Sequence, residues 1–329
     1  MLRSFILHAD HRVSNETSAE AFTAALAEPG CRFWLDMETP TEAEIALLKD
    51  VFQFHPLAIE DSVTYTQRPK VELYNEPDVR AGSYFYLVFH GPDLDTFKEN
   101  LRTKEVDMFV SDRYLVSVHD EPMRSVQFLE DRCNANAKLV LEQGIDVLLY
   151  RLLDFIADAY DTILDHVQES IDELEEKSLN DPKPEVLSKI AVKKRELLNL
   201  RRVIGPQREV VAQLTRGDVP FIRETTRIYM RDVQDHLVRV VELVELYRDL
   251  VLGSRDIYLS SVSNNLNQVM KTLTIISVIG VPMSIVTGFF GMNFDEPIFH
   301  NHRVFIGALI FMGCVVAAML ILFRRKRWI

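Results

Sequence analysis

Two long uncharged stretches stand out in the hydrophobic pattern of the chain, both near its C-terminal end. No charged residue occurs over residues 272–294, a run of 23, and residues 304–323 form another run of 20 uncharged and mostly apolar residues. A helix needs about 20 apolar residues to cross the hydrocarbon core of a bilayer. The pattern therefore predicts two membrane-spanning helices joined by a short polar loop.

The sequence before these stretches is first mixed and then wholly helical in its pattern. Segments rich in β-branched and aromatic residues predict strands, with a hairpin turn at residues 111–113; they are 32–37, 70–74, 83–90, 105–110 and 114–119. Residues 41–52 show helical periodicity after a Thr-Pro-Thr start. From about residue 122 the pattern is helical, so an α/β domain followed by long helices is expected.

Breakers that contain proline or glycine divide the helical part. The periodic run 145–179 ends at an Asn-Asp-Pro-Lys-Pro segment, and a second helix over 186–203 is expected to stop at Gly205-Pro206. A third helix reaches Leu214, before a breaker at residues 216–220. No convincing break follows until Gly291, which predicts one helix of about 70 residues and roughly 100 Å.

An apolar seam follows the part of this helix that precedes the first span. Its members are spaced alternately four and three residues apart, as in a coiled coil: Val233, Leu237, Val240, Val244, Tyr247 and Val251. The seam could pack on other helices of the same chain. Because it leads directly into a span, self-association of several chains around an axis is the favoured interpretation.

The charge of the chain is acidic and unevenly distributed. The 329 residues include 37 Lys and Arg against 49 Asp and Glu, a net charge of −12, and residues 1–270 contain 31 against 47, or −16. Such a balance excludes nucleic acid as an expected partner. Basic residues close the chain at 324–327, whereas the loop between the spans contains one. The positive-inside rule then predicts a multi-pass protein of the cell (inner) membrane with both termini in the cytoplasm.

Small and polar residues form a stripe along one face of the first span. They recur every three or four residues and are preceded by Asn267 at the cytoplasmic entrance: Thr274, Ser277, Gly280, Ser284 and Gly288. Small residues also line close helix contacts in membranes, which is the structural alternative. If the stripe is a wet pore wall, several subunits are needed, because two helices cannot enclose a pore. The second span is apolar all round and suits a position facing lipid.

Motifs along the chain resemble those of one transporter family. Gly291-Met292-Asn293 lies at the outer end of the first span, within the segment TGFFGMNF at 287–294. The other similar segments are SSVSNNLNQVMKTLTII at 260–276, Pro282, RRKRW at 324–328, HPLAIED at 55–61 and QRPKVE at 67–72. Together they resemble the CorA family of divalent-metal channels over nearly the whole chain. The resemblance implies a funnel-shaped homopentamer, in which an α/β cytoplasmic domain is followed by long stalk helices and two transmembrane helices.

The resemblance also assigns parts of a pore. Gly291, Met292 and Asn293 would form the selectivity filter, where a ring of neutral amide oxygens holds hydrated Mg²⁺ without trapping it. Asn is also a common helix C-cap, and both roles can hold at once. The polar stripe would carry the ion inward, and Met270 and Leu273 would form a hydrophobic gate near the cytoplasmic end.

Carboxylates recur at three- and four-residue spacing along the predicted helix 145–179. They are Asp154, Asp158, Asp161, Asp165, Glu169, Asp172 and Glu176. A solvated face is the ordinary interpretation of such a stripe, and a bound cation would relieve its repulsion. By resemblance, Asp232 and Asp61 of a neighbouring subunit form a site for regulatory Mg²⁺, with Glu60 and Asp154 nearby.

The loop between the spans departs from the family pattern. Asp295 and Glu296 could attract cations, whereas His300 and His302 are ligands better suited to Zn²⁺, Ni²⁺ or Co²⁺ than to Mg²⁺. The resemblance as a whole implies uptake of Mg²⁺, and also of Co²⁺ or Ni²⁺, as the function. Zinc transport within the same superfamily is the alternative.

The expected organisation has seven segments. They are a cytoplasmic α/β domain at 1–140, a helical acidic region at 141–219, a stalk at 220–270, a pore-lining span at 271–293, an outer loop at 294–303, a second span at 304–323 and a basic tail at 324–329. A rival from another class is a membrane-anchored sensor or scaffold without a pore. An enzyme is not expected, because the chain contains no phosphate-binding glycine loop, no Gly-x-Ser-x-Gly and no His-Glu-x-x-His.

Overall fold

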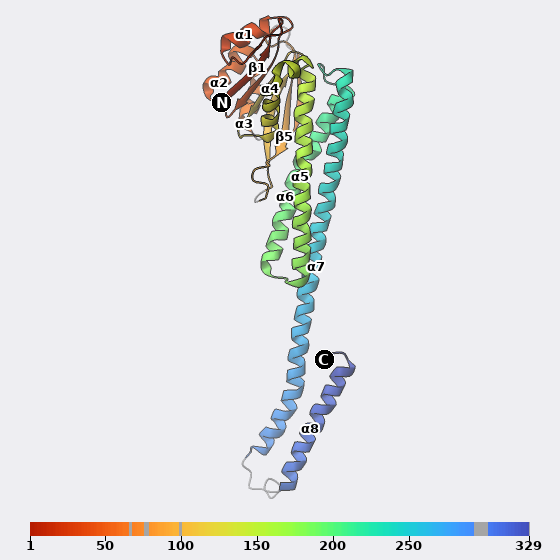
Figure 1. The fold of residues 1–329 in the computed structure, drawn as a ribbon. Helices are drawn as coiled ribbons and strands as arrows, with labels where there is room; N and C mark the ends of the chain where they lie inside the picture. Colours follow the sequence, from red (N-terminus) through yellow and green to blue (C-terminus); the bar gives the residue numbers. More distant parts are fainter. Residues whose placement is uncertain (66–67, 76–78, 99–100, 293–301, 329) are drawn as a thin grey trace. The chain divides into compact units, whose positions relative to one another are not determined.

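The structure is a computed structural model that describes residues 1–65, 68–75, 79–98, 101–292 and 302–328 (Figure 1). The chain forms two compact units. The first contains Met1–Glu176 and Pro184–Ser254, and the second contains Lys177–Lys183 and Arg255–Ile329. The first unit holds a sheet and the surrounding helices, and the second holds the two apolar helical segments.

A seven-stranded mixed sheet is the centre of the α/β domain. Its strands are β1 (Leu2–Leu7), β2 (Val13–Ser14), β3 (Arg32–Glu38), β4 (Lys70–Tyr74), β5 (Tyr84–Pro92), β6 (Thr103–Val110) and β7 (Tyr114–His119). Their order is β2-β1-β3-β7-β6-β5-β4, with β3 and β7 parallel and the other pairs antiparallel. The five predicted strands are confirmed, and so is the hairpin between β6 and β7. The sequence pattern missed β1, because its six residues show no clear alternation of apolar and polar positions and its partner β3 lies far along the chain.

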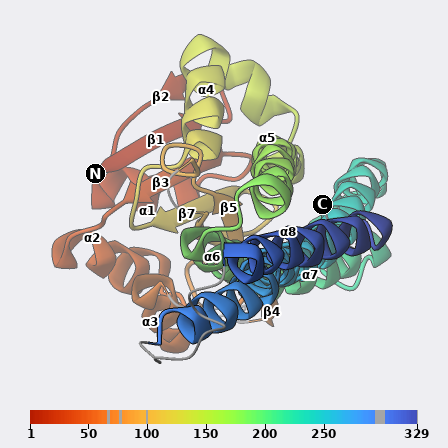
Figure 2. The same cartoon turned by 90° about the horizontal axis from the view of Figure 1, so that it is seen from below.

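Helices cover both faces of this sheet (Figures 1 and 2). One face carries α1 (Ala19–Ala27), α2 (Glu42–Leu47), the π-helix η1 (Leu48–Phe52) and α3 (Pro56–Thr64). Aromatic rings fill the core beneath them: Phe52 and Phe54 stack at 5.1 Å, and Phe54 stacks on Phe109 at 4.1 Å. The other face carries α4 (Arg124–Glu142) and the first part of α5 (Ile145–Asn180). Burial on both faces makes the domain a three-layer α/β structure.

Helix α6 (Pro184–Arg216) corrects one prediction, because it continues through Gly205-Pro206 instead of stopping there. Residues on both sides of the proline are fully buried, and the amide of the buried Gln207 donates to the carbonyl of His90 at 2.9 Å. Proline removes the hydrogen bond to the carbonyl four residues earlier, which here belongs to the exposed Arg202 and can bind water. Packing along the whole helix therefore outweighs one lost hydrogen bond.

The apolar seam of α7 (Glu224–Phe290) is a second correction. All six seam residues are 5% exposed or less within the single chain, so they pack against its own helices. Polar contacts confirm which helices these are: Tyr247 donates to Gln168 of α5 at 3.0 Å, and Arg201 of α6 pairs with Glu245 at 2.8 Å. The favoured interpretation, a seam for self-association, was wrong because a heptad pattern reports a buried face without naming what covers it.

The second unit contains the two apolar helical segments, which are the end of α7 and α8 (His302–Arg325). Their most apolar windows have mean hydropathies of 2.0 and 2.8, and no part of either window is buried. Large apolar side chains such as Ile276, Ile285 and Phe311 are at least 60% exposed. Both lengths suit a bilayer, and the two spans predicted from the sequence correspond to these segments.

Candidate ion pathway and acidic site

The predicted pore-lining residues lie on one face of α7, in its apolar part. Their spacing of three or four residues keeps them in line on a helix, and Asn267, Ser277, Ser284 and Gly288 are exposed. The hydroxyl of Thr274 donates to the carbonyl of Met270 at 2.7 Å, which leaves its oxygen lone pairs available to another partner. The stripe is therefore a narrow polar surface on an otherwise apolar helix.

The predicted gate residues lie at the N-terminal end of this stripe. Met270 is 58% exposed and Leu273 is 56% exposed, although both are apolar. Polar side chains, including Asn267, precede them along α7. An apolar ring at this level would form only if the same residues of several chains met.

The helix ends at the first residues of the predicted filter. The Gly291 amide donates to the Thr287 carbonyl at 2.9 Å, and the Met292 amide donates to the Phe289 carbonyl at 3.3 Å. A Cβ at Gly291 would lie 3.2 Å from the Thr287 carbonyl oxygen, which is close enough to favour glycine. Three predicted residues lie outside the described part of the chain: Asn293, Asp295 and Glu296.

An acidic cluster forms where α5 meets α7 in the first unit. His236 of α7 lies between two carboxylates of α5, 3.2 Å from Asp158 and 3.1 Å from Asp161. Burial raises the pKa of Asp154, and the charges of Asp158 and Asp232 raise it further. Asp154, Asp158 and Asp232 therefore lie close enough for their charges to interact.

His236 is the member of this cluster that sequence reasoning missed. Its side chain is only 12% exposed, and it contacts two acids that precede it by more than 70 residues. The one available signal was its position four residues after Asp232, which places both on the same face of a helix. That signal could not name the partners on α5. The four acids of the stripe beyond Asp161 are exposed, as a solvated face would be: Asp165, Glu169, Asp172 and Glu176.

The other two predicted regulatory acids lie on α3. Asp61 accepts a hydrogen bond from the Lys70 ammonium at 2.6 Å, and the same ammonium reaches Glu72 at 2.9 Å. Glu60 is exposed at the surface. Asp61 is therefore paired with a Lys ammonium, whereas Asp158 and Asp161, near Asp154, are in contact with the imidazole of His236.

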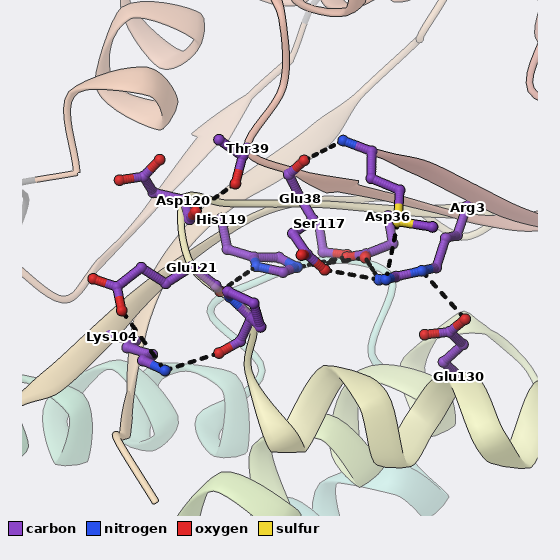
Figure 3. Close-up of polar contacts among 12 residues, drawn as sticks. Arg3, Asp36, Glu38, Thr39, Lys104, Ser117, His119, Asp120, Glu121 and Glu130 are labelled. Atoms are coloured by element: carbon purple, nitrogen blue, oxygen red, sulfur yellow. Dashed lines mark hydrogen bonds and ion pairs between the residues drawn. The ribbon is translucent and has the colours of Figure 1, made fainter. Parts of the chain in front are cut away.

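A buried polar network occupies the other face of the sheet (Figure 3). Asp36 is 1% exposed and accepts hydrogen bonds from Ser117 at 2.6 Å and from His119 at 3.2 Å. Arg3 pairs with Asp36 at 3.5 Å and with Glu130 of α4 at 3.2 Å. Burial alone lowers the pKa of His119, but the hydrogen bond and charge of Asp36 outweigh it and raise this pKa above 6.5. The network ties β1, β3, β7 and α4 together.

These features define a membrane protein with two candidate spans, a polar stripe along the first of them and an acidic cluster in its helical stalk. The chain matches the family of CorA-like Mg²⁺ transporter proteins over residues 32–325, and it belongs to this family. The resemblance stated from the motifs is confirmed.

Individual relatives agree with this assignment. The chain is 34% identical over 281 residues to the cobalt/magnesium transport protein CorA of Thermotoga maritima. The aligned region covers 85% of this chain and 78% of that protein. It is 25% identical over 306 residues to the divalent cation transporter CmaX of Pseudomonas aeruginosa, with coverages of 90% and 87%. The solved structure of the CorA magnesium transporter from Methanocaldococcus jannaschii has the same fold, with a TM-score of 0.81, 23% identity, and coverages of 100% and 99%.

Proposed function

We propose that the chain is one subunit of a homopentameric Mg²⁺ channel that also passes Co²⁺ and Ni²⁺. The observation that carries the proposal is the polar stripe on the apolar part of α7, which leads to Gly291 and Met292 at the end of the helix. Five such helices around an axis would turn five stripes inward and leave α8 toward lipid. The basic residues at 324–327 favour cytoplasmic termini in the cell (inner) membrane.

The filter is assigned to Gly291, Met292 and Asn293. Mg²⁺ is small and loses water reluctantly, so a ring of neutral amide oxygens can hold its hydration shell and still release it. Asp295 and Glu296 follow at once and would concentrate cations at the outer mouth. An inside-negative potential supplies the driving force, about 2.3 kcal/mol per charge at 100 mV and twice that for a divalent ion.

Regulation is assigned to Mg²⁺ bound between subunits at Asp61 and Asp232, with Glu60 and Asp154 nearby. The raised pKa of Asp154 supports this assignment, because burial raises it first and the nearby charges of Asp158 and Asp232 raise it further. Bound Mg²⁺ would relieve this repulsion and hold the ring closed, with Met270 and Leu273 forming a dry gate. When cytosolic Mg²⁺ falls, repulsion loosens the ring and the gate wets.

Uptake into proteoliposomes that contain a Mg²⁺-sensitive dye tests the proposal. An inside-negative potential is imposed, and wild type is compared with Asn293→Ala and with the matched control Asn301→Ala. Potential-driven uptake that only Asn293→Ala abolishes is the expected result. Uptake of Zn²⁺ under a proton gradient without Mg²⁺ flux would instead favour zinc transport, for which His300 and His302 are suited. Folded protein that conducts no divalent ion would favour a sensor or scaffold.

A further inference from the structure

Three potential metal ligands of different chemistry meet at the edge of the α/β domain. His8 follows β1, Glu28 is the C-cap of α1, and Cys31 immediately precedes β3. A ring nitrogen of His8, a carboxylate oxygen of Glu28 and Sγ of Cys31 all lie within 4.8 Å of one another. Within the described parts of the chain, no other three such side chains gather this closely.

Two tight turns bring these side chains together. The His11 amide donates to the His8 carbonyl at 2.9 Å, and the Cys31 amide donates to the Glu28 carbonyl at 3.3 Å. The second turn contains Gly30 at a φ of +88°, a conformation that glycine adopts without strain. Glu28 and Cys31 are thus separated by two residues in a turn, the spacing at which Cys-x-x-Cys motifs present two ligands to one zinc ion.

The remaining polar atoms of these residues are held by hydrogen bonds from outside the cluster. Nε2 of His8 lies 2.9 Å from the hydroxyl of Ser14, and the Ala9 amide donates to Oε1 of Glu28 at 2.8 Å. Nδ1 of His8 and Oε2 of Glu28 then face each other at 3.0 Å. Ligating histidines and carboxylates are typically oriented by such outer hydrogen bonds. The arrangement is therefore preorganised on its outer side as well as at the ligands.

The three side chains differ in their exposure to solvent. The side chains of His8 and Glu28 are 18% and 34% exposed, whereas Cys31 is fully buried. An ion could enter past His8 and Glu28 and keep a water molecule as its fourth ligand. The ligand atoms of tetrahedral zinc are about 3.3–3.6 Å apart, so only small side-chain movements are required.

We propose that His8, Glu28 and Cys31 bind one transition-metal ion of the Zn²⁺ or Co²⁺ kind, independently of the ion pathway along α7. On binding, the thiol of Cys31 loses its proton to solvent and the metal–sulfur bond forms. The imidazole coordinates through Nδ1 and carries its one N–H proton on Nε2, which donates a hydrogen bond to the Ser14 hydroxyl. A thiolate and an imidazole select such ions over Mg²⁺, which prefers oxygen ligands.

Titration of the full-length protein with Co²⁺ tests the site directly. A thiolate bound to Co²⁺ gives a near-ultraviolet charge-transfer band that oxygen ligands of a pore cannot produce. We expect this band to saturate at one Co²⁺ per chain, to disappear on addition of Zn²⁺ and to persist in excess Mg²⁺. Absence of the band from the wild-type protein would overturn the proposal.

Variants identify the residues that produce the charge-transfer band. Cys31→Ser is expected to abolish it, whereas the controls Cys133→Ser and Cys314→Ser retain it. Replacing the buried Cys31 also changes the packing around it. Glu28→Gln and Ser14→Ala therefore provide a second measure that leaves the thiol in place. Each is expected to weaken Co²⁺ binding about tenfold or more. A band that survives Cys31→Ser, or an affinity unchanged in both other variants, would show that these residues do not form the site.

Discussion

Single carboxylates of the first unit differ in the side chains that they contact. Asp61 has an ammonium partner at 2.6 Å, while Asp154 and Asp232 share a region in which His236 is the basic group facing Asp158 and Asp161. Like charges held close together favour a cation between them. The proposed regulation by Mg²⁺ therefore has its physical basis at this scale.

Replacing Asp232 by lysine is expected to remove inhibition by Mg²⁺. The ammonium supplies the positive charge that the ion would bring, so the closed ring no longer depends on bound Mg²⁺. Uptake into dye-loaded proteoliposomes is measured at low and high Mg²⁺ on the cytoplasmic side. Asp235→Lys, on the exposed surface of the same helix, is the control. Inhibition that persists in Asp232→Lys would remove Asp232 from the site.

Replacing His119 by glutamine is expected to destabilise the α/β domain more at pH 6 than at pH 9. The folded pKa of His119 lies above 6.5, so its contribution is complete below 6.5 and is lost as the pH rises through the raised value. The loss at pH 6 is about 2 kcal/mol, typical of a charged hydrogen bond, because Arg3 and Ser117 still hold Asp36. Unfolding of the detergent-solubilised protein at both pH values measures the difference.

The control for this prediction is His11→Gln, which changes a histidine whose side chain is 64% exposed. It is expected to alter stability little at either pH. Equal destabilisation by His119→Gln at pH 6 and pH 9 would mean that the His119–Asp36 contact acts through packing and not through charge.

Helix α7 combines two environments in one element. Its first part has a seam buried against α5 and α6, whereas its apolar part is exposed and carries the polar stripe. The start of the helix is held to α5 by Asp146, which accepts hydrogen bonds from Arg223 at 2.8 Å and Thr226 at 2.6 Å. An unbroken helix of 67 residues can transmit a movement of the stalk to the apolar part. Regulation and conduction are thus proposed to share one element.

A serine in place of Leu273 is expected to increase Mg²⁺ uptake at high cytosolic Mg²⁺, because a polar ring wets more readily than an apolar one. The uptake assay described for Asp232 measures it. Ile279→Ser is the matched control, since residue 279 lies on the opposite face of the helix from the stripe. If both variants leak equally, the gate lies elsewhere or the helix has been loosened as a whole.

At the scale of the whole molecule, a single chain leaves its apolar segments uncovered. Neither apolar window is buried, and the proposed regulatory site would join Asp61 of one chain to Asp232 of another. A membrane and further copies of the chain would cover the first surface and complete the second site. The proposed channel is therefore a property of the assembly.

Native mass spectrometry from a mild detergent is expected to give a complex of five chains. Five copies of the stripe enclose a pore, which two spans of one chain cannot. Met292→Ala, which changes a side chain beyond the end of α7, is expected to leave the count unchanged. A monomer or dimer that still conducts Mg²⁺ would contradict the proposed assembly.

Local pattern was enough to predict much of the fold. Strands such as β7 and helices such as α5 follow from side-chain periodicity, and β6 and β7 are joined by a turn that the sequence marks. Pro206 shows where local rules fail, because buried contacts on both sides carry α6 through it. The residues of the proposed pathway were found by motif and spacing, while His236 was missed because its partners lie on another helix.

The sequence by itself determined the two apolar segments, the long helix before them, the polar stripe and the family, because each is recorded in residues close together along the chain. The tertiary structure alone decided that the seam of α7 is covered by α5 and α6, that Asp36 and His119 meet within the sheet, and that His8, Glu28 and Cys31 gather at its edge. Periodicity states which face of an element avoids water. The surface that covers this face depends on contacts between distant segments, which packing of the whole domain selects.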